Sequence, residues 1–225
     1  MGARVISAEQ AISAGYQYFL RHGTVDMDQV AVALAVSRAT LYRVISSRDR
    51  LLSEVLWRLV SDSIDRARAL RTQTGVDGVI EVVRTFSDEL LDATPLQHFI
   101  SSEPEAATRV LMTPAGGLHR RSVKAVKELF EEAAPAGPWI LDDRGNLAYL
   151  LVRIVESLYF AELLAGTPPD RDLAECTIRA LMVQACTPRR SRMTKILDAA
   201  SCLMWTSVPA FLSDERFTLA PLGGL

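Results

Sequence analysis

The chain has 225 residues, 49% apolar and 23% charged, which is typical of a globular protein with a substantial core and no membrane-spanning segment. Its cysteines (Cys176, Cys186 and Cys202) are widely spaced and no leader pattern opens the chain, so we expect reduced thiols in a cytoplasmic protein, with no disulfide or zinc site. The net charge is −2, yet residues 1–50 hold six arginines against four acidic residues, a distribution that suits DNA contact through one end.

Helical periodicity runs through the first third of the chain, and its start and stop signals predict four helices. The first spans about residues 7–22 and ends at Gly23, the residue type that most readily closes a helix. Short polar side chains that cap helix N-termini precede the next three: Asp26, Ser37 and Ser47. The fourth helix then continues to about residue 71.

Apolar residues recur at helical spacing in the rest of the chain, with prolines at the breaks. We expect helices at 76–92, 95–112 (with a break near Pro104), 117–134, 143–165 and 170–186, and another through Met204. Because no segment has the period of a strand, the expected fold is all-α. Its parts are a helix-turn-helix domain at 1–50, a ligand-binding and dimerisation domain at 51–187 with a connecting helix at 51–75, and a C-terminal extension at 188–225.

The third expected helix has polar side chains suited to DNA. Its apolar residues, Leu41 and Val44, have the spacing of a seam against the preceding helix, which leaves the polar ones exposed. Arginine binds guanine edges through two hydrogen bonds, and threonine contacts a thymine methyl group or a phosphate. We assign base reading to Arg38, Thr40 and Arg43. Hydroxyl groups and helix N-termini suit phosphates, so we assign phosphate contacts to Ser37, Tyr42 and Arg48.

The alternative interpretation of this face is the solvated surface of an ordinary helical pair. Against it stands a complete series: a helix ending in Gly23, a capped helix, a tight turn, Ser-Arg-Ala-Thr-Leu-Tyr-Arg, then Ser-Ser-Arg-Asp-Arg-Leu-Leu. Residues 6–58 therefore resemble the N-terminal module of the TetR family of bacterial repressors. Three residues depart from the family pattern. Ala35 replaces a turn glycine, so the turn must accept a non-glycine conformation, and Val44 and Ile45 replace a His-Phe pair.

The expected helix 143–165 is apolar almost all the way round. A helix without a polar face is buried on two sides. In a chain of this size, one side is the subunit's own core and the other a second copy of the helix across a two-fold axis. The resemblance likewise implies that the C-terminal helices form a ligand pocket and a dimer interface. We expect a homodimer through 143–165 and 170–186.

Three polar residues, Arg153, Glu156 and Ser157, interrupt this apolar helix. Burying a charge without a partner is costly. Either Arg153 and Glu156 pair at i,i+3 spacing, or one of them orients the polar group of a ligand. The candidate ligand-binding residues are Phe86, Leu90, Phe99, Arg109, Met112, Tyr149, Arg153, Glu156, Tyr159 and Phe160. For each of the wall residues taken singly, core packing is the simpler interpretation.

Two segments, PLQHFISSEPEAATRVLMTPAGGLHRRSVKAV and LAYLLVRIVESLYFAELLAGTPPD, resemble the regulatory domain of QsdR-type members of the TetR family. That group is associated with the degradation of lactone signals in actinobacteria. The resemblance implies an amphipathic effector, such as an acyl homoserine lactone, a γ-lactone or another fatty-acyl compound. The residues by themselves support only a mostly apolar pocket with few polar groups.

An enzyme is not expected, because the three histidines (His22, His98 and His119) are scattered and no nucleophile elbow or phosphate-binding glycine loop is present. We expect no cofactor, metal or membrane partner. The main hypothesis is a dimeric repressor that leaves its operator DNA when a small amphipathic ligand binds, with two reading helices about 34–36 Å apart. The alternative is a helical ligand-binding or scaffold protein without sequence-specific DNA binding.

Overall fold

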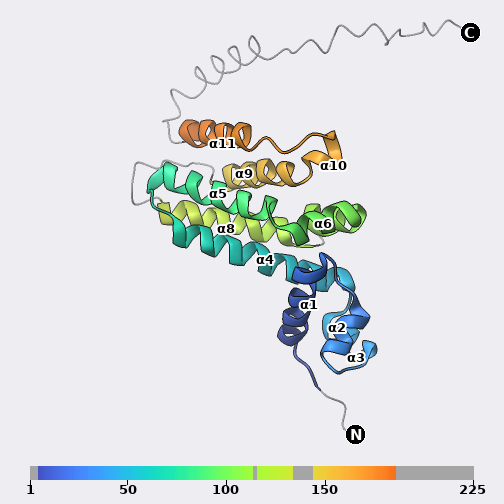
Figure 1. Cartoon of the computed structure of the whole chain (residues 1–225). Helices are drawn as coiled ribbons and strands as arrows, with labels where there is room; N and C mark the ends of the chain where they lie inside the picture. Colours follow the sequence, from blue (N-terminus) through green and yellow to red (C-terminus); the bar gives the residue numbers. More distant parts are fainter. Residues whose placement is uncertain (1–4, 114–115, 134–143, 186–225) are drawn as a thin grey trace, which may run out of the picture. The chain divides into compact units, whose positions relative to one another are not determined.

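The computed structural model describes residues 5–113, 116–133 and 144–185, which are helical apart from their connections (Figure 1). No strand occurs in these ranges, so the predicted all-α fold is confirmed. The chain divides into two units, Met1–Cys186 and Thr187–Leu225, and the following description concerns the first. The predicted helix through Met204 and the extension at 188–225 lie outside the described residues. No described helix is long and apolar enough to cross a membrane.

Four helices make up the N-terminal part: α1 Ala8–His22, α2 Met27–Ala33, α3 Arg38–Ile45 and α4 Arg48–Leu70. The predicted caps are confirmed, because the side chains of Asp26, Ser37 and Ser47 each accept hydrogen bonds from backbone N–H groups of the following turn. Such a cap stabilises a helix by about 1 kcal/mol. Gly23 closes α1 at a φ of 63°, and a Cβ there would lie 2.7 Å from the His98 ring, so only glycine fits.

The remaining helices are α5 Gly75–Leu91, α6 Thr94–Ser102, α7 Pro104–Ala107, the π-helical turn η1 Thr108–Met112, α8 Leu118–Ala133, α9 Arg144–Tyr159, α10 Ala161–Ala165 and α11 Arg171–Ala185. The predicted break near Pro104 is present. The single helix predicted at 143–165 is instead α9 and α10, separated at Phe160. Phe160 is buried in the core, whereas Leu164 beyond it is exposed.

Two large apolar cores and a small cluster of Leu91, Leu158 and Ala174 hold these helices together. The first joins α1–α4 to α6, α7 and η1, and includes the edge-to-face contact of Phe19 with Phe99, whose ring centroids are 5.9 Å apart. Both phenylalanines are fully buried, so truncating either to alanine costs about 3–5 kcal/mol. The second core joins the end of α4 to α5, α8, α9 and α11. The predicted domain boundary lies between residues 50 and 51, and the first core contains residues from both sides of it. The N-terminal module and the body therefore share packed side chains.

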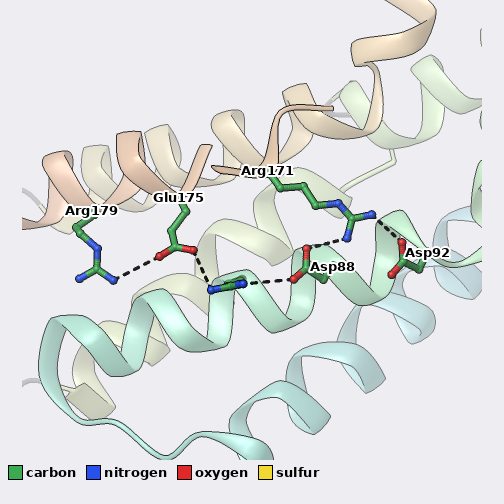
Figure 2. Close-up of polar contacts among 6 residues, drawn as sticks. Asp88, Asp92, Arg171, Glu175 and Arg179 are labelled. Carbon is green, nitrogen blue, oxygen red and sulfur yellow. Dashed lines mark hydrogen bonds and ion pairs between the residues drawn. The ribbon is translucent and has the colours of Figure 1, made fainter. Parts of the chain in front are cut away.

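Ion pairs join α5 to α11 along one edge of the body (Figure 2). Arg171 donates to Asp88 and Asp92 at 2.9 and 2.6 Å, and Arg84 of α5 lies 3.4 Å from Glu175 of α11. Each exposed pair by itself contributes little stability. They link one face of α11 to α5, while Leu173 and Val183 of α11 remain exposed.

Candidate DNA-binding surface and effector cavity

The turn between α2 and α3 presents the candidate DNA-binding face. Ala35, which replaces a turn glycine, has a φ of 53°. It therefore adopts the left-handed conformation that the sequence predicted for this turn. Backbone bonds from Ala35 to Val32 and from Val36 to Ala31 close the turn. Leu41 and Ile45 are buried beneath α3, which leaves its other side chains facing solvent.

Five of the six residues predicted to contact DNA lie on this face. Ser37, Arg38 and Arg43 are exposed, while Thr40 and Tyr42 are half-buried. The Ser37 hydroxyl caps α3 through the Thr40 amide and also lies 2.9 Å from the Thr40 hydroxyl. These contacts hold the polar groups of the first turn in place, where the helix N-terminus favours an anion.

The two arginines of α3 differ in their surroundings. Arg38 donates to Asp28 at 3.0 Å, and its guanidinium lies 5.4 Å from the centre of the Tyr42 ring. Because this ion pair is 59% exposed on both sides, water screens it and DNA can replace the carboxylate at little cost. Arg43 has no ion pair or hydrogen bond within the described ranges beyond its helix backbone, so its guanidinium is available to a base edge.

Arg48, predicted to contact a phosphate, lies in a different environment. Its Nε donates to the Val25 carbonyl at 2.7 Å, and its Nη2 donates to Thr24 at 2.9 Å and to Glu103 at 2.7 Å. Thr24 also donates to Glu103. These partners hold the guanidinium on the side facing Glu103, so Arg48 ties the module to the body, and its phosphate contact stays a prediction.

Two further bidentate ion pairs join the start of α4 to the body. Arg109 donates to Asp49 at 2.6 and 3.2 Å, and Arg121 donates to Glu54 at 2.8 and 2.9 Å. The hydrogen bonds from these arginines hold the pKa of both carboxyl groups below its usual value. We call Arg48–Glu103, Asp49–Arg109 and Glu54–Arg121 the α4 ion pairs.

An apolar cavity of about 80 Å³ lies between α4, α5, α6, α8 and α9. Leu56, Leu59, Val60 and Ile64 of α4 form one wall. Of the residues that line it within the described part of the chain, only Ser122, Glu156 and Tyr159 have polar side-chain atoms. The helix that follows the candidate DNA-reading helix is therefore also a wall of the cavity.

Five of the ten predicted ligand-binding residues line this cavity: Phe86, Leu90, Glu156, Tyr159 and Phe160. The other five lie elsewhere. Phe99 packs on Phe19 in the first core, and Met112 is half-buried at the end of η1. Arg109 pairs with Asp49, as described above.

The remaining two, Tyr149 and Arg153, lie near the cavity without lining it. The Arg153 guanidinium donates to the Tyr149 hydroxyl at 3.2 Å and to Glu156 at 2.8 Å. The i,i+3 ion pair anticipated as one interpretation of Arg153 and Glu156 is thus present. The second Glu156 oxygen lies 2.8 Å from Nδ1 of His119.

His119 and the α4 wall are absent from the sequence-based prediction. His119 is the first-turn residue of α8 and contacts a residue of α9, so no local spacing indicates the pair. The α4 wall has a recognisable signal, because Leu56, Leu59, Val60 and Ile64 recur at helical spacing within the predicted connecting helix.

The sequence profile of the tetracyclin repressor-like C-terminal domain matches residues 74–183. No curated protein matches the chain. Among solved structures, the transcriptional repressor QsdR from R. erythropolis is 26% identical with a TM-score of 0.71, covering 78% of this chain and 93% of its own. The repressor AlkX from Dietzia sp. strain DQ12-45-1b is 22% identical with a TM-score of 0.57, covering 82% and 97%, and shows the same fold.

Both of these repressors are TetR-family proteins. Proteins of this family are transcriptional regulators rather than enzymes, and they bind operator DNA as homodimers. The predicted resemblance to the TetR family is thereby confirmed, and so is the prediction that the chain is not an enzyme. Residues 74–183 belong to the tetracyclin repressor-like C-terminal domain family, and the chain as a whole resembles the TetR-family repressor QsdR in fold and sequence.

Proposed function

We propose that this regulator is a dimeric repressor that leaves its operator when a small amphipathic molecule occupies the cavity. The observation that supports this most directly is that α4 forms a wall of the cavity and is separated from α3 by only two residues, Ser46 and Ser47. A ligand that displaces this wall also displaces the reading helix. The effect requires tighter ligand binding to the DNA-incompetent state, and DNA then weakens ligand binding to the same extent.

The α4 ion pairs are the proposed route of coupling. They join residues 48, 49 and 54 to Glu103 between α6 and α7, to η1 and to α8. Both η1 and α8 also contribute to the cavity lining, through Leu111 and Leu118. When ligand binding moves η1 and α8, the α4 ion pairs therefore transmit this movement to the first turns of α4. Arg38, Thr40 and Arg43 remain the proposed base readers, with Ser37 and Tyr42 as phosphate contacts.

The proposed dimer interface consists of α9 and α11. Exposed apolar side chains on these helices, Leu150, Leu173 and Val183, lie outside both cores of the single chain. Their burial against a second copy accounts for a helix that is apolar almost all the way round. In the proposed dimer the two copies of α3 lie about 34–36 Å apart, the spacing of successive major grooves.

A gel-shift experiment with the DNA upstream of the chain's own gene tests this function. We expect specific retardation by the full-length protein, and release of the DNA when a lactone or fatty-acyl compound is added. Retardation that persists at saturating ligand, with ligand binding demonstrated separately, would contradict release. Binding of the ligand with no preference for this DNA over random sequence would favour the scaffold interpretation.

A further inference from the structure

A groove of about 250 Å³ lies between α5 and α11, separate from the candidate effector cavity. Its apolar lining consists of buried side chains: Ile80, Val83, Leu158, Ala174 and Ile178. Of the residues that line the groove in the described part of the chain, only Val83 also lines the cavity. Since an apolar cavity of about 150 Å³ is sufficient for benzene, the groove is large enough for a small molecule with a short alkyl chain.

The Ser87 hydroxyl of α5 is a buried polar group of this groove. Ser87 lines the groove and is only 6% exposed, and its hydroxyl oxygen has no hydrogen-bond partner among the described residues. The Tyr159 hydroxyl of α9 lies beside it, and this group is also buried without a hydrogen bond to any described residue. Leaving a buried hydroxyl unpaired costs free energy, which a ligand that bonds to it recovers.

The charges around these hydroxyls favour a cation. Burial raises the pKa of Tyr159 above its ordinary value, and the negative charges of Glu156 and Asp88 raise it further. The lining of the groove within the described ranges contains three carboxylates, those of Asp88, Asp172 and Glu175, against two guanidinium groups. A positively charged ligand is therefore attracted to the groove, and a negatively charged one is repelled.

Arg84 of α5 shows where a cation lies in this groove. Its Nε is 3.8 Å from Asp88 and its Nη1 is 3.4 Å from Glu175, so one cationic group reaches a carboxylate of each helix (Figure 2). Both distances exceed those of Arg171, whose contacts are 2.9 and 2.6 Å. The Arg84 side chain is 64% exposed, and ion pairs of this kind contribute little stability. A ligand cation that also bonds to the Ser87 hydroxyl can therefore replace Arg84 at little cost.

We propose that the groove binds a small protonated alkylamine as a second ligand, with its ammonium group bonded to Ser87 and to the carboxylates of Asp88 and Glu175. An ammonium group has three N–H donors, so it matches one hydroxyl and two carboxylates. The carboxylates compensate the charge that becomes buried, and the alkyl chain packs on the apolar lining. The site lies outside the cavity of the proposed function, and binding there does not depend on operator release.

Three probes with equal numbers of non-hydrogen atoms test the ligand class: pentylamine, pentan-1-ol and butyrate. Binding of each probe to the full-length protein is measured by calorimetry at neutral pH, without DNA. We expect the protonated amine to bind about tenfold more tightly than the alcohol, because its hydrogen bonds to the carboxylates are charge-assisted. Butyrate is expected to bind most weakly, because the carboxylates of the groove repel it.

Three substitutions in the groove test the assigned contacts. Ser87→Ala and Asp88→Asn are each expected to lower the amine affinity about tenfold, because each removes one acceptor of the ammonium group. Arg84→Gln should instead raise the amine affinity about threefold, because it removes the cation that competes for the two carboxylates. A variant that fails to fold cannot produce such a gain, and melting temperatures report the folding of the other two.

Glu156→Gln and Glu131→Gln are the matched controls. The first removes the carboxylate of the candidate effector cavity, and the second removes an exposed carboxylate of α8. Both should change the amine affinity far less than Asp88→Asn does. If Glu156→Gln abolishes amine binding while Asp88→Asn preserves it, the amine occupies the cavity and the proposed site is wrong.

The proposed site is also wrong if pentylamine does not bind, if the alcohol or butyrate binds as tightly as the amine, or if folded Ser87→Ala retains the parent's amine affinity. A weaker amine affinity in Arg84→Gln would likewise contradict competition for the carboxylates. Operator binding by the same preparation is measured separately by gel shift. A failure of the amine site is therefore distinguishable from a failure of the proposed repressor function.

Discussion

Arg43 is the side chain of α3 whose replacement tests base reading most directly, because its guanidinium has no ion pair or hydrogen bond to another side chain among the described residues. We expect Arg43→Ala to weaken operator binding by about 1–3 kcal/mol and to relax sequence preference. Tyr42→Phe should weaken binding to all sequences alike. The measurement is a gel shift with operator and scrambled DNA at several salt concentrations.

Lys124→Ala is a matched control for Arg43→Ala, since it also removes one exposed positive charge, from α8 instead of α3. It should leave operator affinity and specificity unchanged. If Arg43→Ala and Lys124→Ala bind the operator equally across the salt series, the assignment of Arg43 as a reader is wrong.

Ala35 is a second residue with a local consequence. A non-glycine residue in the left-handed region is strained, and its exposed methyl group lies outside both cores. We expect Ala35→Gly to increase the free energy of unfolding by about 0.5–1 kcal/mol, after allowing for the greater freedom of glycine in the unfolded chain. Chemical denaturation measures this. Ala39→Gly, within α3, is the control and should destabilise the protein.

At the scale of helices, the α4 ion pairs make stability depend on pH in a defined range. The pKa of Glu54 is lowered in the folded protein, first by its hydrogen bonds with Arg121. Its contribution is therefore complete above the unfolded value of about 4.3 and is lost as the pH falls through the lower folded value. From pH 7 to about 5 the contribution should not change.

Glu54→Gln tests this contribution. We expect the variant to be less stable than the parent by about 1 kcal/mol at pH 7, as for a partly exposed bidentate pair. This difference should shrink as the pH falls below about 4. Denaturation curves collected between neutral and acid pH provide the comparison. Glu131→Gln, at an exposed position of the same body, is the control and should be as stable as the parent at every pH. If the stability difference between Glu54→Gln and the parent stays constant with pH, the pKa of Glu54 is not lowered in the folded protein.

At the scale of the whole molecule, operator binding depends on the proposed α9–α11 dimer. A charge at an apolar interface is buried without a partner when the dimer forms. We therefore expect Leu150→Glu and Val183→Glu to yield monomers in light scattering and to lose most operator affinity, because the two reading helices are no longer linked. Leu70→Glu, at an exposed leucine of α4, should remain dimeric. Dimers in all three variants would exclude this interface.

The predictable parts of this protein are those that local interactions determine. Ser37 and Ser47 cap helices through bonds to residues three positions away. Gly23 and Ala35 lie in turns whose conformation depends on only a few neighbouring residues. The buried seam of α3 follows from its spacing. For this reason the amino-acid sequence alone predicts the first four helices and the shared surface of five candidate DNA-binding residues on α3.

The break of α9 at Phe160 shows where such reasoning ends. No proline or glycine marks it, and periodicity continues through Leu164. The break is associated with the burial of Phe160 in the first core, among residues of other helices. A pattern of apolar residues indicates that a segment is buried, but not which neighbour decides its path.

The sequence by itself determined an all-α chain with a capped helix-turn-helix and an unusual turn, because caps, turns and amphipathic spacing act over three or four residues. Only the tertiary structure decided the partners of its charges. Arg48 meets Glu103 across 55 positions and His119 meets Glu156 across 37. The contact of Arg48 links the module to the body, which its sequence neighbours do not indicate, because the choice of partner depends on how distant helices pack.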